Sequence, residues 1–202
     1  MLMGGGAMQE KSEMLPEIIV FAGPNGSGKT TVTSLAKVID PYINADDIKK
    51  AIHCSDVAAA VNAEELREDA LKKGQSFTFE TVLSTNRNLD LLKRAKANGY
   101  FIRCIYVLTS NPDINVLRVE AREASGGHGV PEEKIRDRYE KCLGLLPEIQ
   151  KICDIMHIYD NTVSPFRIYK KRKNEHFIWE NEFWDKKKIE DLVGMTSEQD
   201  DL

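Results

Sequence analysis

Residues 23–30 read Gly-Pro-Asn-Gly-Ser-Gly-Lys-Thr, a spacing of glycines, lysine and threonine that suits the phosphates of a nucleotide. The glycines let the backbone wrap with its N–H groups pointing inward, and a following helix adds positive potential at its N-terminus. In this pattern Lys29 reaches the β- and γ-phosphates, and the Thr30 hydroxyl holds Mg²⁺. The sequence therefore predicts that ATP or GTP, with Mg²⁺, is bound by Gly23, Pro24, Asn25, Gly26, Ser27, Gly28, Lys29, Thr30 and Thr31.

Two acids follow short apolar segments and are candidates for proton transfer and substrate binding. Asp46 comes after the predicted strand 41–45, and Glu80 comes near the end of the predicted strand 75–81. Asp46 can accept a proton from an acceptor hydroxyl, whereas the alternative is that Asp46 or Asp47 only caps the next helix. Glu80 can orient Mg²⁺ through water or hold a substrate hydroxyl, or it can be a structural acid at a strand end.

Arginines in residues 111–148 form a third candidate group. Arg118 and Arg122 are four residues apart and so share one face of a predicted helix, and Arg136 and Arg138 lie on a second helix after the hinge 125–130. We expect the two helices to form a lid whose arginines bind phosphoryl oxygens. The alternative is that these arginines form ion pairs with neighbouring glutamates, and this alternative stays fully open for Arg136 and Arg138. His128, in the hinge, could cap a helix or contact a ligand.

The elements that must position these residues alternate between strands and helices. Apolar runs at 17–22, 41–45, 75–81, 100–108 and 155–161 are separated by helical patterns, which is typical of an α/β fold with right-handed crossovers. We expect a P-loop NTPase fold: a three-layer αβα sandwich with a mostly parallel five-stranded sheet and a helical arginine lid. Asn161, at the end of the fifth strand, is expected near the nucleotide base or the phosphate loop.

Residues 164–202 have a different pattern. Apolar residues flank the basic stretch 170–173, which predicts a β-hairpin, followed by a short helix to Val193 and an acidic tail. The basic turn could bind a polyanion, although lysines also protect exposed strand edges. We expect a disordered leader over residues 1–15 and a kinase domain over 16–163 with its lid at about 111–148. Residues 164–202 are expected to pack on the same domain.

Composition limits the function classes. The chain has 202 residues and a formal net charge of −4, which argues against a general nucleic-acid binder. Its four cysteines have no metal-ligand spacing and are expected to be reduced core residues of a cytoplasmic protein. No apolar run is long enough for a membrane span.

The remaining motifs separate kinases from other P-loop proteins. Residues 125–128 only partly imitate the signature of transporter ATPases, and the strand that should follow it is absent; the base-recognition motif of guanine-nucleotide switches is absent too. A small kinase needs an acid near the γ-phosphate and arginines on a lid, as expected here. A polynucleotide 5′-end kinase and a non-catalytic ATP-binding interaction module stay open as alternatives.

Taken together, the motifs at residues 23–31, 43–48, 79–81, 118–122, 126–131, 138–139 and 159–161 resemble those of the zeta-toxin-like P-loop kinases, most closely the compact bacterial branch labelled "predicted ABC-type ATPase". The resemblance implies a bacterial kinase that phosphorylates a small molecule such as the UDP-sugar UDP-N-acetylglucosamine, and a small antitoxin protein as partner. It implies Lys29 as phosphate lysine, Thr30 as magnesium ligand and Asp46 as general base. It further implies Glu80 as the acid that holds the substrate sugar, and Arg118, with Arg122 as second candidate, as transition-state arginine. The family threonine two residues past the substrate acid is replaced by Val82.

Overall fold

The computed structural model describes residues 15–195. Its centre is one sheet of seven strands in the order β2-β3-β1-β4-β5-β6-β7. The first five strands in this order are parallel, and β6 and β7 are antiparallel to their neighbours. The strands are β1 (Glu17–Ala22), β2 (Tyr42–Ile43), β3 (Phe77–Thr81), β4 (Phe101–Leu108), β5 (Ile155–Asp160), β6 (Phe166–Arg172) and β7 (Glu175–Ile178).

The predicted α/β fold with a mostly parallel sheet is confirmed, but the sheet has seven strands instead of five. The predicted C-terminal hairpin does not stand apart, because β6 pairs with β5 from Ile155↔Arg172 to Asp160↔Phe166. Ile168 and Tyr169 of β6 are fully buried and extend the core beyond β5. The hairpin therefore supplies the partner that the outer edge of β5 needs.

The strand order puts the end of β1 at a switch point. β1 lies between β3 and β4, so the chain leaves β1 toward β2 at one edge and later crosses from β3 over β1 to β4. In open α/β sheets, ligands bind beyond the carboxyl ends of the strands at such a point. The segment that follows Ala22 is the phosphate-binding pattern of residues 23–30.

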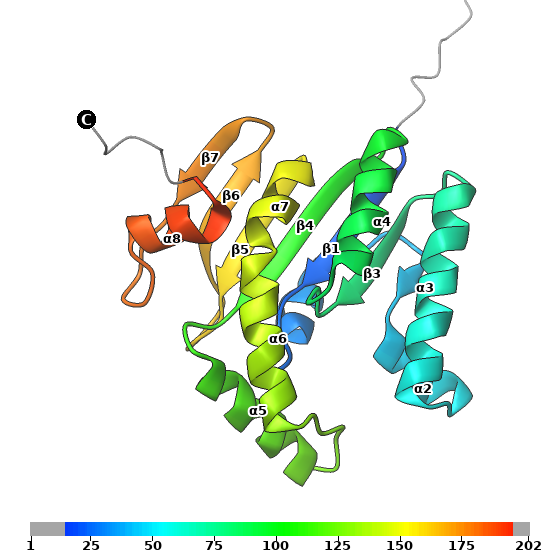
Figure 1. Ribbon diagram of the computed structural model, residues 1–202, viewed down its shortest axis with the longest axis horizontal. Coiled ribbons are helices and arrows are strands. Elements are labelled where there is room, and N and C mark those ends of the chain that lie inside the picture. The colour runs from blue at the N-terminus through cyan, green and yellow to red at the C-terminus, as the bar shows by residue number, and fades with distance from the viewer. Residues whose placement is uncertain (1–14, 196–202) are drawn as a thin grey trace, which may run out of the picture.

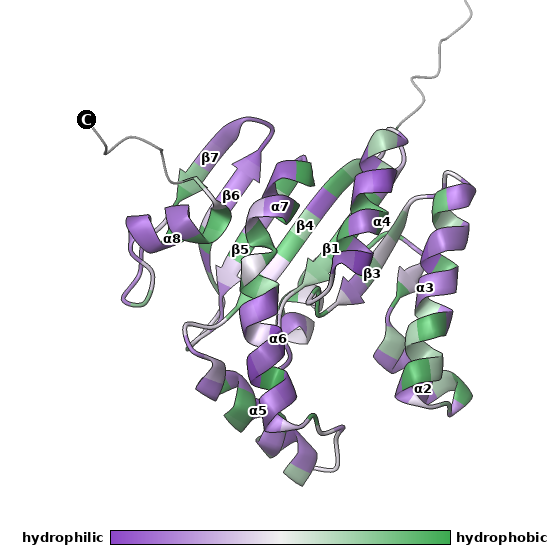
Figure 2. Cartoon of the chain, in the orientation of Figure 1, coloured by the Kyte–Doolittle hydropathy of each residue, from purple (hydrophilic) through white to green (hydrophobic). Residues whose placement is uncertain are grey.

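Most helices cover one face of the sheet. Figure 1 shows α3, α4, α7 and α8 in front of the strands, and their buried side chains join the main hydrophobic core. Figure 2 shows hydrophobic residues along β4 and hydrophilic residues along much of β6. The helices are α1 (Lys29–Thr33), α2 (Ala45–Ile52), α3 (Asp56–Lys72), α4 (Asn86–Ala97), α5 (Pro112–Ala124), α6 (Glu132–Gly144), α7 (Leu146–Ile152) and α8 (Lys186–Val193).

The opposite face of the sheet is covered more thinly. A second core there joins residues of β1 and β4 to Val32 of α1 and to the segment 36–42. Within residues 15–195, α1 is the one helix that contributes buried side chains to this second core. This layer covers β1 and β4 and reaches Tyr159 of β5, and none of the residues of this second core belongs to β6 or β7.

Other predictions concern cysteines, membrane spans and termini. All four cysteines are free, with Cys54 partly exposed and the other three buried. Across residues 15–195, no helix combines the length and the apolar composition needed to cross a membrane. The predicted disordered leader, apart from residue 15, and the acidic tail from 197 onward lie outside the described residues.

Candidate active site

The phosphate loop runs from Gly23 to Gly28 and leads directly into α1. Gly23 and Gly26 have φ of +142° and +76°, which side chains of L-residues rarely adopt. A Cβ at Gly23 would collide with the carbonyl of Val107, and a Cβ at Gly26 would collide with the backbone of Asn115. The loop can therefore hold this conformation between β4 and α5 only with glycine at these positions.

Lys29 closes the loop from inside. Its Nζ donates to the carbonyl oxygens of Gly23 at 2.8 Å and Pro24 at 3.1 Å. Burial lowers the pKa of Lys29, and the nearby Glu80 and Asp46 carboxylates oppose that shift. Lys29 is thus held at the phosphate loop, with the carboxylates of Asp46 and Glu80 nearby.

Three side chains from distant elements hold the loop, two through its backbone and one through the side chain of Asn25. Asn115 Nδ2 donates to the Asn25 carbonyl at 2.6 Å, Arg138 Nη1 to Asn25 Oδ1 at 3.0 Å, and Asn161 Nδ2 to the Ser27 carbonyl at 2.8 Å. Asn115 and Asn161 are buried. Of the two sites that we expected for Asn161, the structure places it at the phosphate loop.

The sequence contains little signal for this brace. Asn115 occupies one buried position of a helix, and nothing in its sequence neighbours shows that its amide meets residue 25.

The structure also separates the two arginines of α6. Arg136 forms ion pairs with Asp113 at 2.6 Å and Glu132 at 2.8 Å, as in the ion-pair alternative, whereas Arg138 reaches the loop.

Asp46 lies in the first turn of α2 with an exposed side chain. The cap of that helix is Asn44, whose Oδ1 accepts from the Asp46 backbone N–H at 2.9 Å. Neither Asp46 nor Asp47 is therefore the cap. Among the described residues the Asp46 carboxylate has no hydrogen-bond or ion-pair partner, and it lies near enough to Lys29 to affect the pKa of that lysine.

Glu80 belongs to a small polar cluster beside Asp46. Tyr42 donates from its hydroxyl to Glu80 Oε2 at 3.0 Å, and Asn44 Nδ2 donates to the same hydroxyl at 3.3 Å. Burial and the Glu80 charge raise the pKa of Tyr42, so its phenol stays protonated near neutral pH. Glu80 thus has one partner for one carboxylate oxygen.

The two lid arginines on α5 point to different places. Arg122 Nη2 donates to the His128 carbonyl at 2.7 Å, and its charge is close enough to lower the pKa of Lys29. Arg118 Nη2 donates to the Thr162 carbonyl at 3.1 Å, and its other terminal nitrogen is buried without a partner in the described part of the chain. The structure therefore brings Lys29, Asp46, Glu80 and Arg122 together, with Arg118 on the side of the segment after β5.

The tip of the lid contacts the α2–α3 corner. His128 Nδ1 lies 3.3 Å from Lys49 Nζ, and His128 Nε2 lies 3.3 Å from Asp56 Oδ2. Lys49 and Asp56 are themselves paired at 2.6 Å. His128 therefore joins the lid to α2, the helix that carries Asp46, and to α3.

A magnesium ion fits this donor set as a companion of the nucleotide. Residues 15–195 contain no group of three or more His, Cys, Asp or Glu side chains that could hold a metal ion by themselves. Thr30 is exposed at the start of α1, directly after Lys29. Mg²⁺ commonly keeps several waters and takes its other ligands from substrate phosphates, so a single protein hydroxyl suits it.

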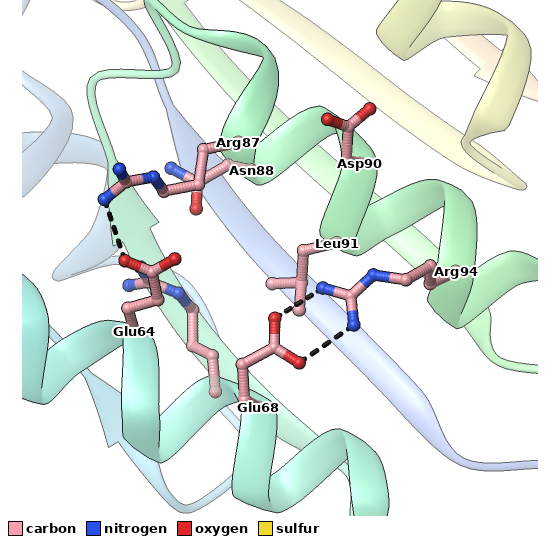
Figure 3. A pocket seen from close by; sticks show the side chains of 8 residues that line it. Glu64, Glu68, Arg87, Asn88, Asp90, Leu91 and Arg94 are labelled. Atoms are coloured by element: carbon pink, nitrogen blue, oxygen red, sulfur yellow. Dashed lines mark hydrogen bonds and ion pairs between the residues drawn. The ribbon is translucent and has the colours of Figure 1, made fainter.

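A groove between α3 and α4 is separate from these residues. Figure 3 shows Glu64 paired with Arg87 at 2.8 Å, and Glu68 with both terminal nitrogens of Arg94, one of them at 2.9 Å. The buried Arg67 lies with its Cζ 5.2 Å from the ring centre of Phe79. The walls of the groove are thus mostly internal ion pairs, and none of the predicted site residues lines the groove.

Comparison with protein families identifies the chain. The family model described as Zeta toxin matches residues 6–182. The chain belongs to the zeta toxin family. A protein of Haemophilus influenzae (strain Rd) with no described function is 33% identical over 132 residues, which cover 62% of this chain and 94% of that protein. The predicted family resemblance is confirmed.

Several solved structures have the same fold as this member of the zeta toxin family. One from the PezAT chromosomal toxin-antitoxin system of Streptococcus pneumoniae has a TM-score of 0.57 and 18% identity, covering 84% of this chain and 77% of that one. The AvrRxo1-ORF1:-ORF2 complex with ATP gives a TM-score of 0.67 and 13% identity, over 94% of this chain and 67% of that one. At these identities the likeness establishes the fold alone.

Proposed function

We propose that this zeta toxin family member is a kinase that transfers the γ-phosphoryl group of ATP or GTP to a hydroxyl of a small molecule. One arrangement carries the proposal: Lys29 is held at the phosphate loop by the Gly23 and Pro24 carbonyls, and the charges of Glu80, Asp46 and Arg122 act on it. Phosphoryl transfer needs charge neutralisation around the phosphates and an acid that receives the hydroxyl proton. The free carboxylate of Asp46 beside the loop lysine supports this pairing.

In the proposed reaction, the oxygen of the acceptor hydroxyl forms a bond to the γ-phosphorus while Asp46 accepts the hydroxyl proton. The bond from that phosphorus to the bridging oxygen breaks, and the nucleoside diphosphate leaves. Lys29 and Arg122 neutralise the developing charge, with Arg118 proposed as a further transition-state arginine and Arg138 as its alternative. Thr30 would hold Mg²⁺, which would supply positive charge at the phosphates.

UDP-N-acetylglucosamine is the acceptor that we propose. Glu80, held by Tyr42, leaves one carboxylate oxygen for a sugar hydroxyl. The replacement of the family threonine by Val82 leaves one polar group fewer at this side of the site. We therefore expect weaker binding of the sugar than a site with that threonine would give.

The test is transfer of label from γ-labelled ATP with Mg²⁺ to a panel of UDP-sugars, nucleosides, aminoglycosides and 5′-hydroxyl oligonucleotides. Lys29→Ala serves as the blank. Label on UDP-N-acetylglucosamine that the blank lacks would support the proposal. Label only on oligonucleotides would favour a polynucleotide 5′-end kinase. Free phosphate alone would indicate ATP hydrolysis with the acceptor missing from the panel, and ATP binding with no release or transfer of label would favour a non-catalytic ATP-binding module.

The role of Asp46 is tested against its neighbour. Asp46→Asn should lower kcat by about 100-fold or more, the scale of general-base catalysis, with little change in nucleotide affinity. Asp47→Asn is the matched control, because Asp47 is exposed in the same helical turn and has only a 3.9 Å ion pair with Lys50. Equal activity in both variants would remove Asp46 from the mechanism.

We also propose a small antitoxin protein as partner and the cytoplasm as location. The antitoxin is suggested by family membership and by the toxin-antitoxin system of the pneumococcal neighbour, and the cytoplasm by the four free cysteines. Growth arrest on expression of the chain, relieved by Lys29→Ala, would support a toxin that needs an antitoxin. Normal growth at equal protein levels would contradict it.

A further inference from the structure

The face of the sheet opposite α7 and α8 carries aromatic and basic side chains from three adjacent strands. His157 pairs with Lys170 across β5 and β6, and Lys170 pairs with Phe177 across β6 and β7. Tyr159 pairs with Arg167 after the bulge. Residues directly opposite one another in neighbouring strands share a face, and the bulge puts Arg167 on the same face as Lys170. We therefore define the aromatic-basic face as His157, Tyr159, Arg167, Lys170, Phe177 and Trp179, the last directly after β7.

Contacts join these six side chains into one continuous surface. Arg167 Cζ lies 4.6 Å from the ring centre of Trp179, and Lys170 Nζ lies 5.5 Å from that of Phe177. The Phe177 and Trp179 rings are 6.2 Å apart and inclined by 20°, and the His157 and Tyr159 rings are 6.3 Å apart and inclined by 17°. The rings of each pair thus lie nearly parallel, and Arg167, whose Nη1 lies 3.5 Å from His157 Nδ1, connects the two pairs.

The surface is positively charged although the chain is acidic overall. Neither Arg167 nor Lys170 has an acidic partner within 4 Å among residues 15–195, and Arg167 Nε is buried without a partner there. Burial and the charges of Arg167, Lys170 and Arg103 lower the pKa of His157 to about 4, so this histidine is neutral at physiological pH. Arg103 is itself paired with Glu17 at 2.9 Å.

Protection of a strand edge does not account for this surface. Lys171, in the middle of the predicted basic turn, points to the helical side and donates to the Gln150 carbonyl at 2.6 Å. Phe177 and Trp179 are 41% and 36% exposed, although edge protection calls for charge and not for large rings. Exposed rings interleaved with arginine and lysine are typical of single-strand nucleic-acid binding.

We propose that the aromatic-basic face binds single-stranded nucleic acid, with bases stacked on Phe177 and Trp179 and phosphates against Arg167 and Lys170. The mild net negative charge argued against general nucleic-acid binding, and the proposed site is local instead. It goes beyond the proposed kinase reaction and does not depend on it. An acidic protein would pair with the two cations but would leave the parallel rings without stacking partners.

Tryptophan fluorescence gives a direct test. The chain has two tryptophans, and Trp184 is buried, so Trp184→Phe leaves Trp179 as the reporter. Titration with a 12-mer of oligo(U) should quench its emission, because a stacked base lies on the indole ring. With about two phosphates neutralised, the slope of log affinity against log salt should be about −1.4.

Variants and competitors complete the experiment. In anisotropy titrations of labelled oligo(U), Trp179→Ala and a combined Arg167→Gln and Lys170→Gln variant should each lose about fivefold or more in affinity. Lys187→Gln, a loss of one exposed charge on α8, should bind normally. Lys29→Ala should also bind normally, which separates this face from the phosphate loop.

Three results would overturn the proposal. They are no quenching of Trp179, an equal loss of affinity in Lys187→Gln, and quenching by poly-glutamate of matched charge as strong as that by oligo(U). The last result would assign the face to an acidic protein. Unchanged thermal melting of each variant ensures that lost binding is not lost folding.

Discussion

Asn25 is the residue through which the lid and the phosphate loop are connected. Asn115 of α5 holds its carbonyl, and Arg138 of α6 holds its side chain. Both bonds end on a residue that any nucleotide in the loop must adjoin. The position of the two lid helices and the shape of the loop are therefore linked by two hydrogen bonds.

Asn115→Ala should weaken both the loop and the fold. The substitution leaves the Asn25 carbonyl and the Thr109 hydroxyl without this amide, and an unsatisfied buried polar group costs about 1–3 kcal/mol. We expect a loss of that size in denaturant unfolding, together with weaker binding of a fluorescent ATP analogue. Leu117→Ala, on the exposed side of the same helix, should change neither quantity. Wild-type nucleotide affinity in Asn115→Ala would show that the brace does not shape the loop.

The lid consists of α5, the hinge 125–131 and α6, and polar contacts of His128 join its tip to the α2–α3 corner. His128 meets Lys49 and Asp56, all of them at least partly exposed. Exposed ion pairs are weak, so this closure is easily reversed. The lid elements thus combine a buried anchor at Val116, Val119 and Ile135 with a loosely held tip.

His128→Ala should release the tip without unfolding the lid. Amide hydrogen exchange over residues 126–130 should become faster by about two- to fivefold, because the contacts that are lost are exposed and weak. Exchange within α6 should stay unchanged, since its buried residues do not touch His128. Glu133→Gln is a control of similar exposure on the same lid. Identical exchange in His128→Ala and wild type would mean that the contact does not hold the lid.

The stability of the whole molecule should depend on pH through His157. Its pKa is about 4 in the fold and 6.5 ordinarily, so the unfolded chain binds more protons between these values. Stability from this source is therefore complete above pH 6.5 and is lost as the pH falls toward 4, by about 1–3 kcal/mol. Burial also lowers the pKa of His176, so part of the loss has a second source.

Denaturant unfolding at pH 7 and pH 4.5 measures this dependence. His157→Gln should reduce the difference between the two values relative to wild type, and His176→Gln should reduce it by a separate amount. His53→Gln, in an exposed position at the end of α2, should leave the difference unchanged. If His157→Gln loses as much stability as wild type on acidification, the low pKa of the buried His157 is not the cause of the pH dependence.

The fold class and the phosphate loop could be predicted from the sequence because their signals are local. A glycine pattern between an apolar strand and a helix specifies its own backbone, and alternating strands and helices limit the topology to parallel crossovers. The α/β fold, the family resemblance and the lid of two helices all follow from such patterns. Placing Asp46 and Glu80 near one sheet edge required only the rule that parallel strands end together.

The tertiary structure alone decided which distant side chains meet. Asn115 and Arg138 reach Asn25 from 90 and 113 residues away, and one helical pattern cannot distinguish Arg138 from the ion-paired Arg136. The joining of the hairpin to β5 likewise depends on an edge that no local pattern describes. The aromatic-basic face exists because the pairing of β5, β6 and β7, with its bulge at Ile158/Tyr159, puts these side chains on one side of the sheet, where Tyr159 adjoins the core under α1. Contacts between remote segments depend on packing of the whole chain, so the structure was needed to reveal them.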